Sequence, residues 1–377
     1  MPLPFYIPDA EPQPLLRLQA NVMTDGIVLC VSFHRHAVDG LGISSILQAL
    51  SECCRNPDQP LERLSTSSES EAQSRTRISQ STNESHPCMN DGDGNYIEKA
   101  APSSKLGALI SRRFCLDAAK IRRLREAYNT AARAGIYQTH RITSASPECN
   151  ATSWQGFSNN EVVTALIWLC GVRARSSAIA MKKDGSSSAD LILSLLFAVD
   201  VRGLLNIPNT YMGNAIVTPT STYPFKGAEL HDAEGRLTFK SDTADYGLHK
   251  IDSNDITLLT NQALSGQTTY YSANRNHVRY AISHIMASKD WHLPARLGGM
   301  SITNLRRAPG YAMDFGPCLG TAFGIDVPDN RADGVCWIAP QRSDSSARLM
   351  GYESRGFWEV RLTLGPVAME CLSSDRI

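Results

Sequence analysis

Residues 32–42 read SFHRHAVDGLG and are the most informative stretch of the chain. They bring His34, His36 and Asp39 together within six residues, directly after an apolar run. A histidine beside a turn is more often a structural residue than a catalytic one, so the stretch alone assigns no chemistry. The question it raises is whether proton transfer can take place here, given that Arg35 separates the two histidines.

The segments on either side of this stretch predict how it is presented. Upstream, residues 15–33 read as two strands around the turn Thr24-Asp25-Gly26, because Asp-Gly between apolar runs favours a β-hairpin. Downstream, the apolar residues of 41–54 recur at helical spacing. The order is therefore buried strand, polar turn and helix, and we expect the polar turn to lie at the mouth of a cleft.

The composition of the whole chain excludes several classes of protein. Its 377 residues and 42% hydrophobic content suffice for about two globular domains. The 37 basic and 37 acidic side chains cancel, so the chain lacks the positive charge that nucleic-acid binding requires. The ten cysteines form no CxxC pair, which argues against a metal site. Without a signal-peptide pattern or an apolar run of membrane-spanning length, we expect a soluble cytoplasmic protein.

Composition and capping signals divide the rest of the chain into elements. Residues 56–104 are rich in Ser, Thr, Glu, Asn and Gly, which predicts a solvated linker. Asp117 and Gly135 suit the two ends of one helix, and Ser158 with Glu161 forms a capping box for the next. Strands interleaved with helices predict a two-domain α/β architecture. We expect strands near 110–115, 190–200, 299–304, 311–315, 334–340 and 357–364, and helices near 117–134, 158–175, 274–287 and from 366.

Three further motifs follow the first in order. Residues 198–202 read AVDVR, residues 211–214 read YMGN and residues 311–316 read YAMDFG. In this order they resemble the hallmarks of the BAHD-type CoA-dependent acyltransferases, in particular the fungal trichothecene 3-O-acetyltransferase-like enzymes. The capped helix NNEVVTALIWLCGVRAR at 159–175 resembles the family's segment before VDxR. The resemblance covers most of the chain, and the joint order of the motifs makes it specific.

The resemblance implies both a fold and an activity. The fold is α/β, with two chloramphenicol-acetyltransferase-like lobes that face a shared channel. The activity is that of a monomeric, cytoplasmic O-acyltransferase without a metal. Such an enzyme transfers an acetyl or other acyl group from acyl-CoA, with acetyl-CoA expected first, to a hydroxyl of a small secondary metabolite such as a mycotoxin. Because the sequence has no Gly-rich phosphate loop, CoA binding is implied by the resemblance alone.

The chain departs from the family pattern in two places. The spacing puts Arg35 where the family has its catalytic histidine, so the strict HxxxD motif is absent. Only 33 residues precede His34, whereas family members carry most of an N-terminal domain there. We therefore expect residues 1–55 to be the remnant of an incomplete N-terminal lobe, 56–104 a disordered crossover linker, and 105–377 the C-terminal lobe with the DFG motif.

The family mechanism needs a base and a hydrogen-bond donor. An imidazole removes the proton of the acceptor hydroxyl, and a donor stabilises the tetrahedral oxyanion. Arg35 cannot be the base, because its guanidinium stays protonated. Side chains alternate along an extended segment, so His34 and His36 share one face, and a slip of the loop by one residue would bring His36 to the cleft. His36 and then His34 are the candidate bases; alternatively both are structural and the site is inactive. Thr303 resembles the family's oxyanion donor, or is an ordinary strand threonine.

The other candidate site residues have structural roles in the family. Asp39 resembles an aspartate that points away from the substrate and pairs with the arginine of VDxR, here Arg202. A bidentate pair would fix the turn at Gly40 to the other lobe; the alternative is two unrelated surface charges. Asp314 resembles a structural residue of the family that shapes the cleft. We expect Asn214 to set backbone geometry near the cleft and Gly316 to be structural at the site, and we assign no catalytic step to any of the three.

Two other functions stay open at this point. A catalytically impaired acyltransferase-like protein would bind a small molecule in the same cleft, and Arg35 together with the short N-terminal lobe favours it. A relative of the condensation domains, which act on carrier-bound substrates, would share the histidine motif, but the DFG motif argues against it. Release of free thiol from acetyl-CoA separates the enzyme from the binding protein.

Overall fold

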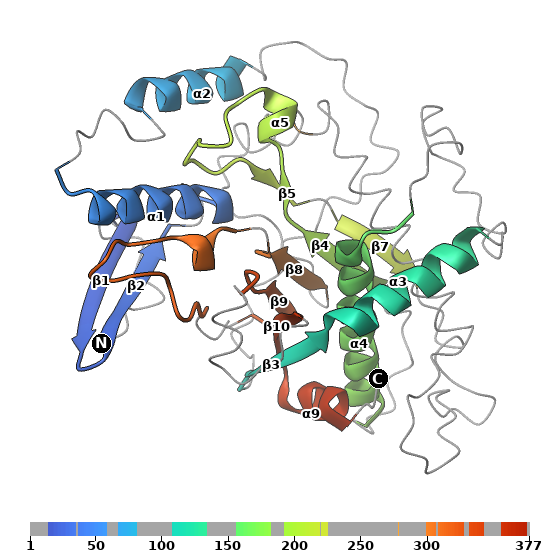
Figure 1. Cartoon of the computed structure of the whole chain (residues 1–377). Coiled ribbons are helices and arrows are strands. Elements are labelled where there is room, and N and C mark those ends of the chain that lie inside the picture. Colours follow the sequence, from blue (N-terminus) through green and yellow to red (C-terminus); the bar gives the residue numbers. More distant parts are fainter. Residues whose placement is uncertain are drawn as a thin grey trace.

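The computed structural model describes residues 14–34, 37–58, 67–80, 108–133, 156–181, 192–218, 220–224, 278, 299–306, 308–327, 332–342 and 356–374. These residues form a mixed α/β structure (Figure 1). Its strands are β1 (Leu16–Met23), β2 (Gly26–Phe33), β3 (Ile110–Asp117), β4 (Ile192–Phe197), β5 (Val199–Asp200), β6 (Ile216–Val217), β7 (Thr220–Pro224), β8 (Met300–Asn304), β9 (Val335–Ile338) and β10 (Phe357–Leu364). Its helices are α1 (Gly40–Arg55), α2 (Ser68–Gln80), α3 (Ala118–Arg133), α4 (Asn159–Met181), α5 (Arg202–Leu205) and α9 (Pro366–Ser374), with a 3₁₀ turn η4 (Gly310–Ala312).

The centre of the molecule is a six-stranded sheet in the order β3-β10-β9-β8-β4-β7. Strands β4, β8 and β9 are parallel to one another, and β3, β10 and β7 pair antiparallel with their neighbours. Side chains alternate between the two faces of a sheet. On β8, Met300 and Ile302 are buried in the main core, so Ser301 and Thr303 lie on the opposite face, where both are half-buried. The sheet therefore has one core face and one more polar face.

Helices α3, α4 and α9 cover the core face (Figure 1). Helix α4 is buried around most of its circumference, as expected of an apolar helix at the centre of a core. The predicted capping box is confirmed, because the backbone N–H of Ser158 donates to Glu161 Oε2 at 2.7 Å and that of Glu161 donates to Ser158 Oγ at 3.3 Å. The predicted cap at Asp117 is confirmed too, since its Oδ1 accepts from the backbone of Ala119 and Lys120.

Strands β1 and β2 form the predicted hairpin, with Met23 opposite Gly26. The expectation that β2 is buried is wrong. The register places one apolar residue opposite another along a whole face of the hairpin, and much of this face is exposed: Val22 is 80% and its partner Ile27 is 47% accessible. Among the described residues the two strands pair only with each other, so no third strand covers them. The incomplete N-terminal lobe stays a prediction.

Four other sequence-based expectations either differ from the structure or fall outside the described residues. Helix α2 lies inside the polar segment 56–104, which we expected to be unstructured throughout. Residues 311–315 do not form a strand, because η4 covers their start and Asp314 makes only an isolated bridge with Thr321. The helix expected at 274–287, apart from residue 278, and the C-cap at Gly135 lie outside the described residues.

The described residues contain neither a membrane-spanning helix nor a cluster of metal-binding side chains. None of the helices there is both long and apolar enough to cross a membrane. Within the same ranges no three His, Cys, Asp or Glu side chains are grouped closely enough to hold a metal ion.

Candidate active site

Asp39 begins helix α1 and is its N-cap. One carboxylate oxygen, Oδ1, accepts hydrogen bonds from the backbone N–H of Leu41 at 3.0 Å and of Gly42 at 2.8 Å. An aspartate in this position satisfies donors that the first turn of a helix leaves unpaired. The end of the HRHAVDG stretch is thus fixed by the helix that follows it.

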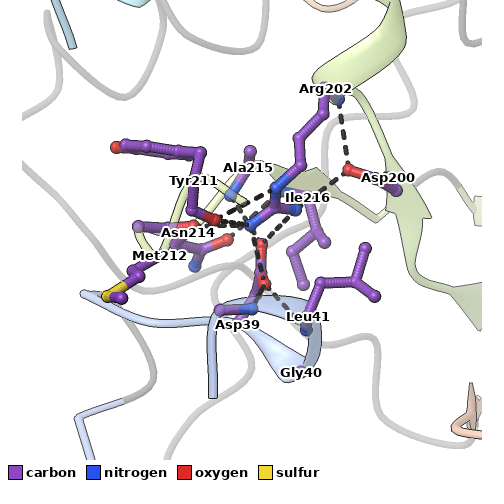
Figure 2. Close-up of polar contacts among 12 residues, drawn as sticks. Asp39, Gly40, Leu41, Asp200, Arg202, Tyr211, Met212, Asn214, Ala215 and Ile216 are labelled. Atoms are coloured by element: carbon purple, nitrogen blue, oxygen red, sulfur yellow. Dashed lines mark hydrogen bonds and ion pairs between the residues drawn. The ribbon is translucent and has the colours of Figure 1, made fainter. Parts of the chain in front are cut away.

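The predicted ion pair between Asp39 and Arg202 is confirmed, and it is bidentate (Figure 2). Arg202 Nη1 donates to Asp39 Oδ2 at 2.9 Å and Nη2 donates to Oδ1 at 3.0 Å. Both side chains have no solvent-accessible surface. The alternative of two unrelated surface charges is therefore wrong. Planar guanidinium and carboxylate groups in this arrangement give short, directional bonds.

Arg202 uses the rest of its guanidinium to hold the chain around the pair. Nη1 also donates to Asp200 Oδ1 at 3.0 Å, and Nη2 donates to the carbonyls of Tyr211 at 2.9 Å and Gly213 at 2.8 Å. Burial lowers the pKa of Arg202, but the bonds to Asp39 and then to Asp200 outweigh it, so its pKa is raised above the usual range. The arginine is charged at every pH of biological interest.

The YMGN loop closes over the turn from the other side. Asn214 donates its backbone N–H to the carbonyl of Ala37 at 2.9 Å, and Ala215 donates to Asp39 Oδ2 at 2.7 Å (Figure 2). A Cβ added at Gly42 would overlap the carbonyl oxygen of Met212, so only glycine allows this approach. Asn214 thus contacts the turn through its backbone N–H, while its side-chain Oδ1 accepts from the backbone N–H of Ile216 at 3.2 Å.

Of the two candidate bases, His34 lies among the described residues and His36 does not. His34 is exposed, and its backbone is hydrogen-bonded on both sides. The backbone N–H of His34 donates to the carbonyl of Leu15 at 2.9 Å, and the carbonyl of His34 accepts from the backbone N–H groups of Ala37 and Val38 at 3.0 and 3.1 Å. Arg35 and His36 lie outside the described residues. The choice of base stays a prediction.

The C-terminal end of β8 lies against the start of α1. A Cβ added at Gly40 would be 3.2 Å from Cδ2 of Leu305, the residue directly after β8. Thr303, two residues earlier, is on the sheet face away from the core and pairs in register with Trp337 of β9. The structure thus brings the polar turn near the strand that carries Thr303; its role as an oxyanion donor stays a prediction.

The DFG motif is a turn packed against the other end of α1. Asp314 Oδ1 accepts from the backbone N–H of Gly316 at 2.9 Å. Gly316 has φ of +90°, and a Cβ there would be 3.0 Å from the Cα of Arg55. Asp314 thus stabilises the turn, in agreement with the structural role that the resemblance implied, and the turn requires glycine.

The sequence interpretation missed a buried group of charges beside this turn. Arg342 forms a bidentate ion pair with Glu359 of β10, with two N···O distances of 3.0 Å, and its guanidinium lies 5.1 Å from the ring centre of Tyr311. The hydroxyl of Tyr311 accepts from the backbone N–H of Ile325 at 3.0 Å. These contacts attach the loop that contains the DFG turn to the sheet. Spacing in the sequence gives no signal for them, because the partners come from different elements.

Comparison with known proteins identifies the family. The model of the Transferase family matches residues 2–375. Over the whole chain and 74% of the relative, the sequence is 28% identical to the fumigaclavine B O-acetyltransferase of Aspergillus fumigatus. It is 27% identical, over the same shares, to an O-acetyltransferase of Neosartorya fischeri.

Solved structures show the same fold. TRI101 of F. sporotrichioides, in complex with coenzyme A and T-2, matches 97% of this chain and 69% of its own with a TM-score of 0.65 and 16% identity. Vinorine synthase matches 95% of this chain and 64% of its own with a TM-score of 0.51 and 14% identity. The described residues therefore have the α/β fold of these proteins. From its family model, its motifs and its fold, the chain belongs to the Transferase family of BAHD-type acyltransferases.

Proposed function

We propose that the protein is a CoA-dependent O-acyltransferase that moves an acetyl or other acyl group from acyl-CoA to a hydroxyl of a fungal-type secondary metabolite. The observation that carries the proposal is the anchored turn. In a chain that matches the family model from residue 2 to residue 375, the buried pair of Asp39 and Arg202 holds the start of α1 in place, where Gly40 lies against Leu305 directly after β8. The names of the relatives, which are O-acetyltransferases of fungi, support acetyl-CoA as the donor.

The proposed reaction needs no covalent enzyme intermediate. The imidazole of His36, or of His34, removes the proton of the acceptor hydroxyl while the oxygen attacks the thioester carbonyl. Thr303 donates a hydrogen bond to the oxyanion that forms. When this intermediate collapses, the carbon–sulfur bond breaks, the ester is released, and the imidazolium returns its proton to the thiolate of CoA. Asp39 takes no part, because its oxygens already accept five hydrogen bonds.

Release of free thiol from acetyl-CoA tests the proposal, with two substitutions that locate the base. A positioned general base contributes about 10²- to 10⁴-fold to the rate. If Arg35 limits the site, Arg35→His raises turnover by a factor in that range. If His36 already serves, Arg35→His has little effect and His36→Ala abolishes the activity, with His34→Ala as the matched comparison. If none of these substitutions changes thiol release and acetyl-CoA does not bind, the proposed enzymatic function is refuted.

Arg35 also supports a second candidate, a protein that binds a small molecule or acyl-CoA without turnover. Such a protein would bind acetyl-CoA measurably in calorimetry and would release no thiol over hours. For either candidate we propose a small-molecule hydroxyl compound as the partner, a monomer as the working form and the cytoplasm as the location.

A further inference from the structure

Helix α2 is attached to the loop that holds the polar turn. Arg77 Nη1 donates to the carbonyl of Asn206 at 2.6 Å, and Glu71 Oε1 accepts from the backbone N–H of Met212 at 2.9 Å. Ser74, between them on the helix, is 1% exposed, and Ile78 packs against the small core formed by Val201, Ile207, Tyr211, Ala215 and Val278. A helix of such polar composition is therefore docked in a defined place.

Met212 connects helix α2 with the turn at the start of α1. The backbone N–H of Met212 donates to the carboxylate of Glu71. The carbonyl oxygen of Met212 lies against Gly42 in the first turn of α1. On either side of Met212, the carbonyls of Tyr211 and Gly213 accept from Arg202. The loop is thus held between α2 on one side and the Asp39 turn on the other.

From this position the negative charge of Glu71 also acts on Tyr211. The pKa of the Tyr211 hydroxyl is raised, first by burial and then by the negative charge of Glu71. Helix α2 contributes little hydrophobic burial, since its one buried residue is Ser74 and Ile78 is its one apolar residue packed against the small core. Helix α2 is therefore held in place by polar contacts more than by hydrophobic burial.

We propose that α2 is a positioning element of the active site, in which Glu71 fixes Met212 and so sets the register of the turn that carries the histidines. This inference rests on the proposed acyl transfer. Loss of the Glu71 acceptor leaves the Met212 N–H to water and lets residues 211–215 shift against α1. Catalytic groups misplaced by about 1 Å lose about 10²-fold in rate.

Three variants test the inference. Glu71→Ala removes the acceptor, and Glu71→Gln restores it, because the amide oxygen of glutamine can accept the same N–H. Glu69→Ala is the matched control: Glu69 is on the same helix, is exposed, and accepts within the helix from Gln73. Helix content by circular dichroism should be the same in all three.

Two measurements are made on each variant. Hydrogen exchange of the peptide that covers 211–216 should be about tenfold faster in Glu71→Ala, as expected for the loss of a bond to a charged acceptor, and unchanged in the other two. The kcat for thiol release from acetyl-CoA should fall about 10- to 100-fold in Glu71→Ala, with KM for acetyl-CoA within about twofold of the parent, and Glu71→Gln should restore it.

The results separate this inference from the proposed function. Unchanged exchange in Glu71→Ala, or faster exchange with an unchanged kcat, overturns the positioning role while the enzyme stands. An equal loss of kcat in Glu69→Ala overturns it as well, because the effect then belongs to the whole helix. A parent that neither binds acetyl-CoA nor releases thiol refutes the proposed function, and the inference falls with it.

Discussion

Replacing Asp39 by alanine should cost more stability than any other single substitution at this site. The carboxylate accepts two bonds from the start of α1, two from Arg202 and one from Ala215. Removing one partner of a buried ion pair costs about 3–5 kcal/mol, because the other charge stays buried without compensation. Loss of the N-cap adds about 1 kcal/mol. We expect the free energy of unfolding to fall by about 4–6 kcal/mol.

The chain offers a matched control in Asp200. It also accepts from Arg202 Nη1 at 3.0 Å, but its side chain is 37% exposed, and water replaces it when it is removed. Asp200→Ala should therefore cost less than about 1 kcal/mol. Both variants remove a carboxylate from the same guanidinium. Asp39→Ala also removes the N-cap of α1 and the acceptor of the Ala215 N–H, so the difference between the variants measures the burial of the pair together with these bonds.

Urea unfolding, followed by tryptophan fluorescence and circular dichroism, gives the midpoints. Since a loss of 4–6 kcal/mol is about as large as the whole stability of many domains, Asp39→Asn is the variant to purify if Asp39→Ala does not fold. Asparagine keeps one oxygen for the helix start but turns an N–H₂ group towards Arg202 or Ala215. The urea midpoint of Asp39→Asn should therefore lie between those of Asp39→Ala and Asp200→Ala. A midpoint of Asp39→Asn at or above that of Asp200→Ala would refute the reasoning.

Three further substitutions test the geometry of the cleft. Gly42→Ala should lower the thermal midpoint and the kcat together, because its Cβ overlaps the carbonyl of Met212; an unchanged midpoint would contradict the contact. Gly316→Ala should destabilise the protein by about 1–3 kcal/mol in urea, since it forces a side chain into the left-handed region at 3.0 Å from Arg55, and a loss below 0.5 kcal/mol would argue against that turn. Thr303→Val should fold normally yet lose about 10²-fold in kcat; normal kinetics would return it to an ordinary strand residue.

Local signals in the sequence predicted local structure well. The hairpin at Asp25-Gly26, the cap at Asp117 and the capping box at Ser158 all depend on residues within three or four positions of one another, and all three are confirmed. The pair of Asp39 and Arg202 was predicted as well, although the two are 163 positions apart, because the order of the motifs resembled a family.

What the sequence could not predict depends on contacts between distant elements. Helix α2 has a composition typical of a solvated linker. Its place is fixed by contacts with distant residues: Glu71 accepts from Met212, Arg77 donates to Asn206, and Ile78 packs against the small core. The apolar alternation of the hairpin favoured a buried strand, but no pattern within it tells what covers it. The pair of Arg342 and Glu359 likewise has no local signal, because only the packing of the DFG loop on the sheet brings the two together.

The anchoring of the polar turn and its proposed chemistry use different atoms. The turn is closed by the backbone of His34, Ala37 and Val38 and by the carboxylate of Asp39, which is fully buried. Each of these contacts is made by a residue other than residue 35. We therefore expect the turn to stay anchored whether position 35 holds arginine or a histidine. For the same reason Arg35→His changes the available base without disturbing the anchor, which makes thiol release from that variant a direct measure of the chemistry.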